Sequence, residues 1–90
     1  MTVRRQYTFY GEVQGVGFRY RARHAAELYG CSGWVRNELN GSVTMEIQGD
    51  TDAIERVLLS IAQGTYIRIE DWSCRDLPPV EGERGFHTVR

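Results

Sequence analysis

The sequence predicts an α+β sandwich, in which an antiparallel sheet carries both helices on one face. Segments with the strand period of two alternate with segments of helical period in the order βαββαβ, and one short further strand follows. Glycines or prolines separate most neighbouring segments. The 90 residues are enough for one two-layer core, so we expect a single domain over residues 1–90.

A change of period around a glycine loop predicts the first strand and the first helix. Residues 7–13 alternate between apolar and polar side chains, which is typical of a strand with one buried face. The loop at residues 14–17 follows. From Phe18 the apolar residues recur at helical spacing, and Gly30 is a typical helix stop.

Two further strands are predicted at residues 32–38 and 42–48, with Asn40-Gly41 between them. Val43, Met45 and Ile47 alternate with polar residues in the second of these strands. Asn-Gly favours a type I′ turn, which requires positive φ at both central positions. We therefore expect an antiparallel hairpin closed by this turn.

The second helix is predicted after Gly49, with Asp50 or Thr51 as its N-cap and Gly64 as its end. Its apolar stripe has i, i+3, i+4 spacing and comprises Ala53, Ile54, Val57, Leu58 and Ile61.

The remaining segment changes phase partway along its length. Ile67 and Ile69 share one phase, whereas Trp72 and Cys74 fall in the other, so we expect a bulge or a turn between them. Prolines at 78 and 79 end this strand, and residues 86–89 form a short last strand. The complete order is that of a ferredoxin-like βαββαβ sandwich, a fold that hosts many functions.

Charge and composition exclude several classes of protein. Eleven basic against twelve acidic residues give a net charge of −1, which excludes a strongly basic nucleic-acid or membrane binder. No apolar run approaches the roughly 18 residues of a membrane span, and Arg4-Arg5 has no apolar run behind it as a secretory signal would. Two cysteines are too few for a disulfide scaffold or a four-ligand metal site. We expect a cytoplasmic protein without a metal.

The densest chemical signal is Gly11-Glu12-Val13-Gln14-Gly15-Val16-Gly17-Phe18-Arg19. A glycine loop before a helix presents backbone N–H groups that attract anions, and a guanidinium matches phosphate oxygens. A cation in the first turn of a helix is unfavourable unless an anion compensates it. The alternative is that the glycines only form the corner and Arg19 is solvated. Neither the P-loop nor the dinucleotide-binding motif fits, since Tyr20 stands where the latter needs glycine.

A second cluster, Gly33-Trp34-Val35-Arg36-Asn37, precedes the Asn40-Gly41 turn. The amide of Asn37 offers both a donor and an acceptor near a strand end. The alternative is that Asn37 only caps the hairpin.

Together these two clusters resemble the acylphosphatase family, and the resemblance covers nearly the whole chain. The matching motifs are Val13-Gln14-Gly15-Val16-Gly17-Phe18-Arg19, Gly33-Trp34-Val35-Arg36-Asn37 and Asn40-Gly41-Ser42-Val43. The resemblance implies hydrolysis of the carboxyl–phosphate bond of acyl phosphates, with Arg19 as phosphate ligand and Asn37 as the residue that orients water. It also implies a phosphate cradle made by the amides of Gly15, Val16, Gly17, Phe18 and Arg19. The segment after Gln63 departs from the family pattern.

The implied mechanism needs no metal, cofactor or covalent intermediate, because phosphoryl transfer depends on positioning and charge stabilisation. We expect inorganic phosphate or sulfate to compete with the substrate. We also expect a monomer without a nucleic-acid or membrane partner and, since the sequence ends at Arg90, a free-standing enzyme.

Two other interpretations remain open at this point. An RNA-binding module on the same fold would use Tyr7 and Phe9 as base-stacking residues. An accessory domain would resemble the one at the start of hydrogenase-maturation carbamoyltransferases. The spacing of Cys31 and Arg36 does not fit a thiol-dependent phosphatase loop, and we expect Cys31 and Cys74 to be free thiols. The two histidines, His24 and His87, are expected at the surface.

Overall fold

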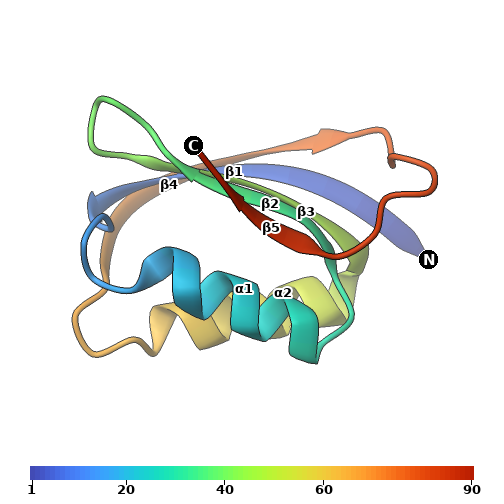
Figure 1. Cartoon of the computed structure of the whole chain (residues 1–90), viewed down its shortest axis with the longest axis horizontal. Coiled ribbons are helices and arrows are strands. Elements are labelled where there is room, and N and C mark those ends of the chain that lie inside the picture. The colour runs from blue at the N-terminus through green and yellow to red at the C-terminus, as the bar shows by residue number, and fades with distance from the viewer.

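The computed structural model describes every residue from Met1 to Arg90 and confirms the predicted fold class. Figure 1 shows two layers, with both helices on the same face of the sheet. No helix is long and apolar enough to cross a membrane. The elements in chain order are β1 (Thr2–Glu12), α1 (Phe18–Leu28), β2 (Ser32–Asn37), β3 (Val43–Asp50), α2 (Thr51–Ala62), β4 (Arg68–Leu77) and β5 (Phe86–Val89).

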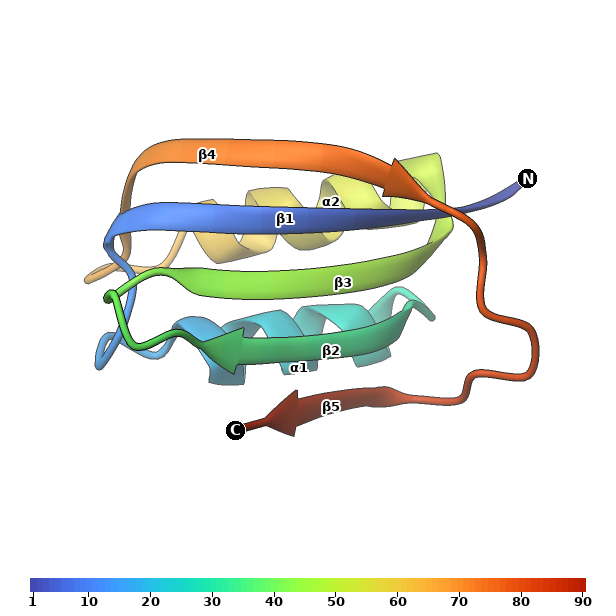
Figure 2. The ribbon, with the colours of Figure 1, turned by 90° about the horizontal axis from the view of Figure 1, so that it is seen from above.

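The sheet has the strand order β4-β1-β3-β2-β5 (Figure 2). The four longer strands pair antiparallel, as expected, whereas β5 lies parallel to β2 and makes the sheet mixed. Phe9 of β1 and Asn37 of β2 both pair with Val43 of β3. Arg36 pairs with Val89 of β5. The carboxyl ends of β1, β2 and β5 therefore meet at one end of the sheet.

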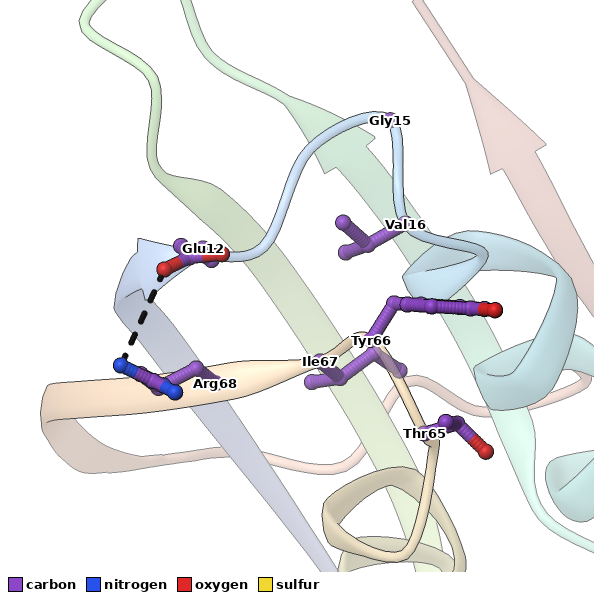
Figure 3. Close-up of a pocket in the computed structure, with 7 residues that line it drawn as sticks. All are labelled: Glu12, Gly15, Val16, Thr65, Tyr66, Ile67 and Arg68. Atoms are coloured by element: carbon purple, nitrogen blue, oxygen red, sulfur yellow. Dashed lines mark ion pairs between the residues drawn. The ribbon is translucent and has the colours of Figure 1, made fainter.

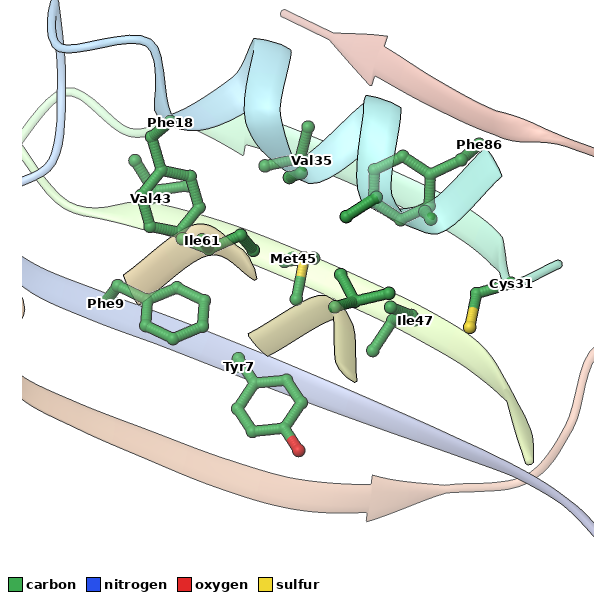
Figure 4. Close-up of a cluster of buried hydrophobic side chains, with 14 of the residues drawn as sticks. Tyr7, Phe9, Phe18, Cys31, Val35, Val43, Met45, Ile47, Ile61 and Phe86 are labelled. Carbon is green, nitrogen blue, oxygen red and sulfur yellow. The ribbon is translucent and has the colours of Figure 1, made fainter. Parts of the chain in front are cut away.

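The core lies between the sheet and the two helices (Figure 4). Tyr7 and Phe9 of β1 are each 3% exposed, and Phe18 at the start of α1 is 1% exposed. The rings of Phe9 and Phe18 lie 5.0 Å apart, so Phe18 holds the first turn of α1 against the sheet. Full burial of such a side chain stabilises the fold by roughly 1.5–3 kcal/mol. The glycine loop is thus fixed on both sides, by β1 and by this anchor.

The hairpin between β2 and β3 does not contain the expected type I′ turn. Gly41 has φ 91°, but no residue other than glycine has positive φ. The Glu38 N–H donates to the Ser42 carbonyl at 2.9 Å, and the Gly41 N–H donates to the Glu38 carbonyl at 3.2 Å. Residues 39–41 therefore form a three-residue loop in place of a two-residue type I′ turn, and a loop of this kind requires only one left-handed residue, which Gly41 supplies.

The phase change in β4 is a bulge, one of the two predicted explanations. Tyr10 pairs with Asp71 and Gly11 with Ile69, which leaves Glu70 as the extra residue. The bulge lets half-buried Ile69 and, beyond it, Trp72 face the same layer.

A buried ion-pair network lies on the sheet face opposite the helices. Arg4 is 3% exposed and donates to Glu83 at 2.7 Å and to Glu46 at 2.9 Å. These bonds hold the loop between β4 and β5 against the sheet. Burial opposes the ionisation of Glu83, but hydrogen bonds from Arg4 and Ser32 outweigh it and hold the pKa of Glu83 below its ordinary value.

Candidate active site

The glycine loop enters α1 with two left-handed residues. Gly15 has φ 72° and Gly17, the N-cap of α1, has φ 84°. A Cβ at either position would contact nothing within 4 Å, so the backbone angle and not the lack of space requires glycine. The conformation is one in which successive N–H groups can point to one side.

The start of α1 carries unsatisfied donors and no compensating anion. Its first helical hydrogen bond runs from the Arg21 N–H to the Gly17 carbonyl at 3.0 Å, so the N–H groups of Phe18, Arg19 and Tyr20 have no backbone acceptor. Gly17 supplies no side-chain cap, and no acidic residue lies in the first turn. This end of the helix therefore attracts an anion.

Arg19 is half-buried, and its guanidinium makes no hydrogen bond or ion pair within the protein. The other arginines that are buried or half-buried all have partners. Arg4 binds Glu83, Arg5 lies 3.4 Å from the Tyr7 hydroxyl, Arg21 donates to the Ser60 carbonyl at 2.9 Å, and Arg36 donates to Glu38 at 3.0 Å. The fold thus leaves one sheltered guanidinium free, and it is the one at the anion-attracting helix end.

Asn37 lies at the end of β2 in the phase of buried Val35, on the helix side of the sheet. Its Oδ1 is buried and has no hydrogen-bond partner within the protein. The hairpin is instead braced by Asn40, whose Oδ1 accepts from the Ser42 N–H at 3.0 Å and the Ser42 hydroxyl at 2.6 Å. The structure therefore contradicts the interpretation of Asn37 as the hairpin cap.

Arg19 and Asn37 line one pocket of about 410 Å³. Its other lining residues are Val13, Gly15, Gly17, Phe18, Tyr20, Arg23 and Thr88. The ring of Phe18 is buried in the core, so only its backbone can serve a ligand there. Of the residues that the sequence indicated, only Val16 is absent from the lining of this pocket.

Val16 faces a second pocket, of about 590 Å³, on the other side of the glycine loop (Figure 3). Gly15 lines both pockets. Tyr66 and Ile67 of the segment before β4 lie beside Val16, and Arg68 is paired with Glu12 at 4.0 Å. The segment after Gln63, which departs from the family pattern, thus lies beside the glycine loop, on the side opposite the pocket of Arg19 and Asn37.

Gln14 connects the glycine loop to the hairpin, a role that the sequence alone did not indicate. Its Nε2 donates to the carbonyls of Glu38 at 2.7 Å and Ser42 at 2.9 Å. These carbonyls flank the loop that follows Asn37. Gln14 therefore fixes the distance between the amide loop and Asn37. The only feature of the sequence that could have indicated this role is the position of Gln14 inside the glycine-loop motif, between Val13 and Gly15.

The other candidate sites from the sequence lack the necessary geometry. Tyr7 and Phe9 are buried beneath the helices and cannot stack bases, so the RNA-binding interpretation is wrong in its proposed surface. Both cysteines are free: Cys74 is exposed, and burial raises the pKa of the Cys31 thiol. His24 and His87 are exposed, as expected. No group of three His, Cys, Asp or Glu side chains is placed to hold a metal ion.

Comparison with known proteins gives one consistent result. Residues 5–88 match the profile of the family described as Acylphosphatase. An acylphosphatase of Salinibacter ruber is 46% identical over 68 residues, which cover 70% of this chain and 72% of that protein. The crystal structure of acylphosphatase from Bacillus subtilis superposes with a TM-score of 0.89 at 28% identity, covering 100% of both chains. Full-length HypF in a phosphate- and nucleotide-bound form matches with a TM-score of 0.87 at 27% identity, over 100% of this chain and 12% of that one.

Proposed function

Since the chain belongs to the acylphosphatase family and is an acyl phosphate hydrolase, we propose that Arg19 and the loop amides bind the phosphate while Asn37 orients the attacking water. The phosphate-binding amides are those of Gly15, Val16, Gly17, Phe18 and Arg19.

One observation carries this assignment: a half-buried guanidinium and a buried amide oxygen, neither with a partner within the protein, line the same pocket. Arg19 has a free guanidinium beside free N–H groups, and Asn37 has a buried Oδ1 without a donor. Buried polar groups in folded proteins are nearly always hydrogen-bonded, so an orphan of this kind calls for an explanation. A substrate phosphate and a nucleophilic water supply the missing partners.

In this mechanism the water oxygen attacks phosphorus and forms a new P–O bond, while the bond from phosphorus to the acyl oxygen breaks. The carboxylate leaves with the bonding electrons, and the two water protons end on the released inorganic phosphate. The Arg19 guanidinium and the loop amides stabilise charge on the phosphoryl oxygens as the bond breaks. The Asn37 Oδ1 accepts a hydrogen bond from the water and holds it in line.

The proposal includes a single domain over residues 1–90 that acts as a monomer, without metal or cofactor. Inorganic phosphate or sulfate should compete with the substrate in the same pocket, since both match the amide loop and Arg19. Titration of inorganic phosphate should shift the amide resonances of residues 15–19 more than any others.

The decisive experiment measures phosphate release from benzoyl phosphate in the wild type, in Arg19→Ala and in Arg56→Ala. Arg56 is an exposed arginine outside the pocket, so its variant controls for loss of a charge. We expect Arg19→Ala to lose roughly 3–4 kcal/mol of transition-state stabilisation, measured as a lower kcat together with a higher KM. Normal hydrolysis by Arg19→Ala would remove it from the site.

The proposed metal independence is tested on the same preparation. Dialysis against a strong chelator should leave the rate of benzoyl phosphate hydrolysis unchanged. Activity that disappears on dialysis and returns with magnesium or zinc contradicts the mechanism.

A further inference from the structure

A second arginine reaches the pocket that contains Arg19 and Asn37. Arg23 lies four residues after Arg19 on α1, hence on the same helix face and about 6 Å further along the axis. It lines the pocket together with Tyr20, Thr88 and the loop, and none of the lining residues is acidic. The pocket therefore has a second arginine in its lining, and the proposed phosphate chemistry does not use it.

The partner of Arg23 within the protein is a weak one. The Arg23 Nε lies 3.6 Å from the Glu27 Oε2, one helical turn further from the loop, and Glu27 does not line the pocket. Both side chains are more than half exposed. Exposed ion pairs of this kind contribute little to stability, because water competes for both charges. An anion inside the pocket can therefore displace Glu27 from Arg23.

We propose that Arg23 binds a carboxylate at the far end of the acyl group, so that the enzyme prefers acyl phosphates of short dicarboxylic acids. This inference rests on the proposed function of Arg19 as the phosphate ligand. A carboxylate matches the fork of a single guanidinium, and no unpaired backbone amides surround Arg23 to complete a second phosphate site.

The spacing of the two arginines selects the length of the acyl chain. Four carbons between the phosphate and the terminal carboxylate oxygens span a distance similar to the rise of about 6 Å over the four helical residues from Arg19 to Arg23. A matched pair of probes follows from this. Fumaroyl phosphate and crotonoyl phosphate have the same four-carbon skeleton and differ in ending with a carboxylate or a methyl group. Their trans double bond keeps the chain extended and prevents cyclisation of the carboxylate onto the acyl carbon.

The experiment compares kcat/KM for the two probes in the wild type, Arg23→Gln, Glu27→Gln and the control Arg56→Gln. We expect Arg23→Gln to lower the fumaroyl-to-crotonoyl ratio about fivefold, which corresponds to roughly 1 kcal/mol for a partly exposed charge pair. Glu27→Gln should raise the ratio up to about twofold, because it removes the competing carboxylate. Arg56→Gln should leave the ratio unchanged. In the wild type the ratio should fall with rising salt, because ions screen an exposed pair.

Each other result overturns the inference. An unchanged ratio in Arg23→Gln means that Arg23 does not contact the acyl end. An equal loss on both probes means that it acts on the phosphate or on the fold. A failure of the proposed function is distinguishable from these results, since crotonoyl phosphate hydrolysis would then be insensitive to Arg19→Ala.

Discussion

Replacement of Asn37 by alanine should separate catalysis from stability. The Asn37 side chain makes no hydrogen bond within the protein, and its buried Oδ1 has no donor. The substitution therefore removes no hydrogen bond within the protein. We expect the free energy of unfolding, and with it Tm, to stay close to that of the wild type.

The same substitution should slow the reaction strongly. Loss of a group that holds the nucleophile in line acts on the transition state and not on substrate binding. We expect kcat to fall about a hundredfold, or roughly 2.7 kcal/mol, while KM and competitive inhibition by phosphate stay nearly unchanged.

Asn40 is the matched control, because it is the same residue type three positions further along the chain and it braces the hairpin. Asn40→Ala loses two hydrogen bonds to Ser42, at 3.0 and 2.6 Å. At roughly 0.5–1.5 kcal/mol each, this loss should lower Tm by several degrees. Its kcat on the folded fraction should remain close to that of the wild type.

The assay is steady-state hydrolysis of benzoyl phosphate together with thermal unfolding followed by circular dichroism, on one preparation of each variant. The reasoning predicts a crossed result: Asn37→Ala is stable and slow, whereas Asn40→Ala is less stable and active. An Asn37→Ala protein with a lowered Tm and an unimpaired kcat would refute both the assignment of the water ligand and the interpretation of the orphaned oxygen.

Three further predictions concern the surroundings of the site and the fold. Arg19→Lys should not restore the activity lost in Arg19→Ala, because an ammonium cannot form the bidentate contact; kcat/KM within tenfold of the wild type would contradict this. Gln14→Ala should lower kcat without a matching loss of phosphate binding by Arg19, since it loosens the tie between the loop and the hairpin; kcat and the phosphate inhibition constant measure this split. Glu83→Gln should lower the free energy of unfolding at pH 7 by roughly 1–2 kcal/mol. Because the pKa of Glu83 is lowered in the folded state, its contribution is present above the unfolded value of about 4.3 and is lost as pH falls through the folded value. The gap in stability between wild type and Glu83→Gln should therefore narrow as pH falls below about 4.3, as urea unfolding across pH would show.

Local patterns in the sequence were sufficient for the order of elements and for the anion-attracting end of the candidate site. Periods of two and 3.6 residues are properties of neighbouring positions, so β1, α1, β3 and α2 were recognisable without knowledge of their partners. Arg19 was recognisable in the same way, because a glycine loop before a helix creates an anion-attracting helix end from neighbouring residues alone.

The tertiary structure decided everything that depends on partners distant in the chain. Asn37 and Asn40 are alike in the sequence, and only the packed hairpin shows that Asn40 has its bonds and Asn37 Oδ1 has none. The parallel pairing of β5 with β2 brings Thr88 to the pocket, although no motif marks that residue. Arg23 was indistinguishable from a solvated arginine until the fold placed it in the lining of the pocket that contains Arg19. Which polar group remains unsatisfied is set by the acceptors and donors that other elements bring to it, and the period of a single segment carries no information about them.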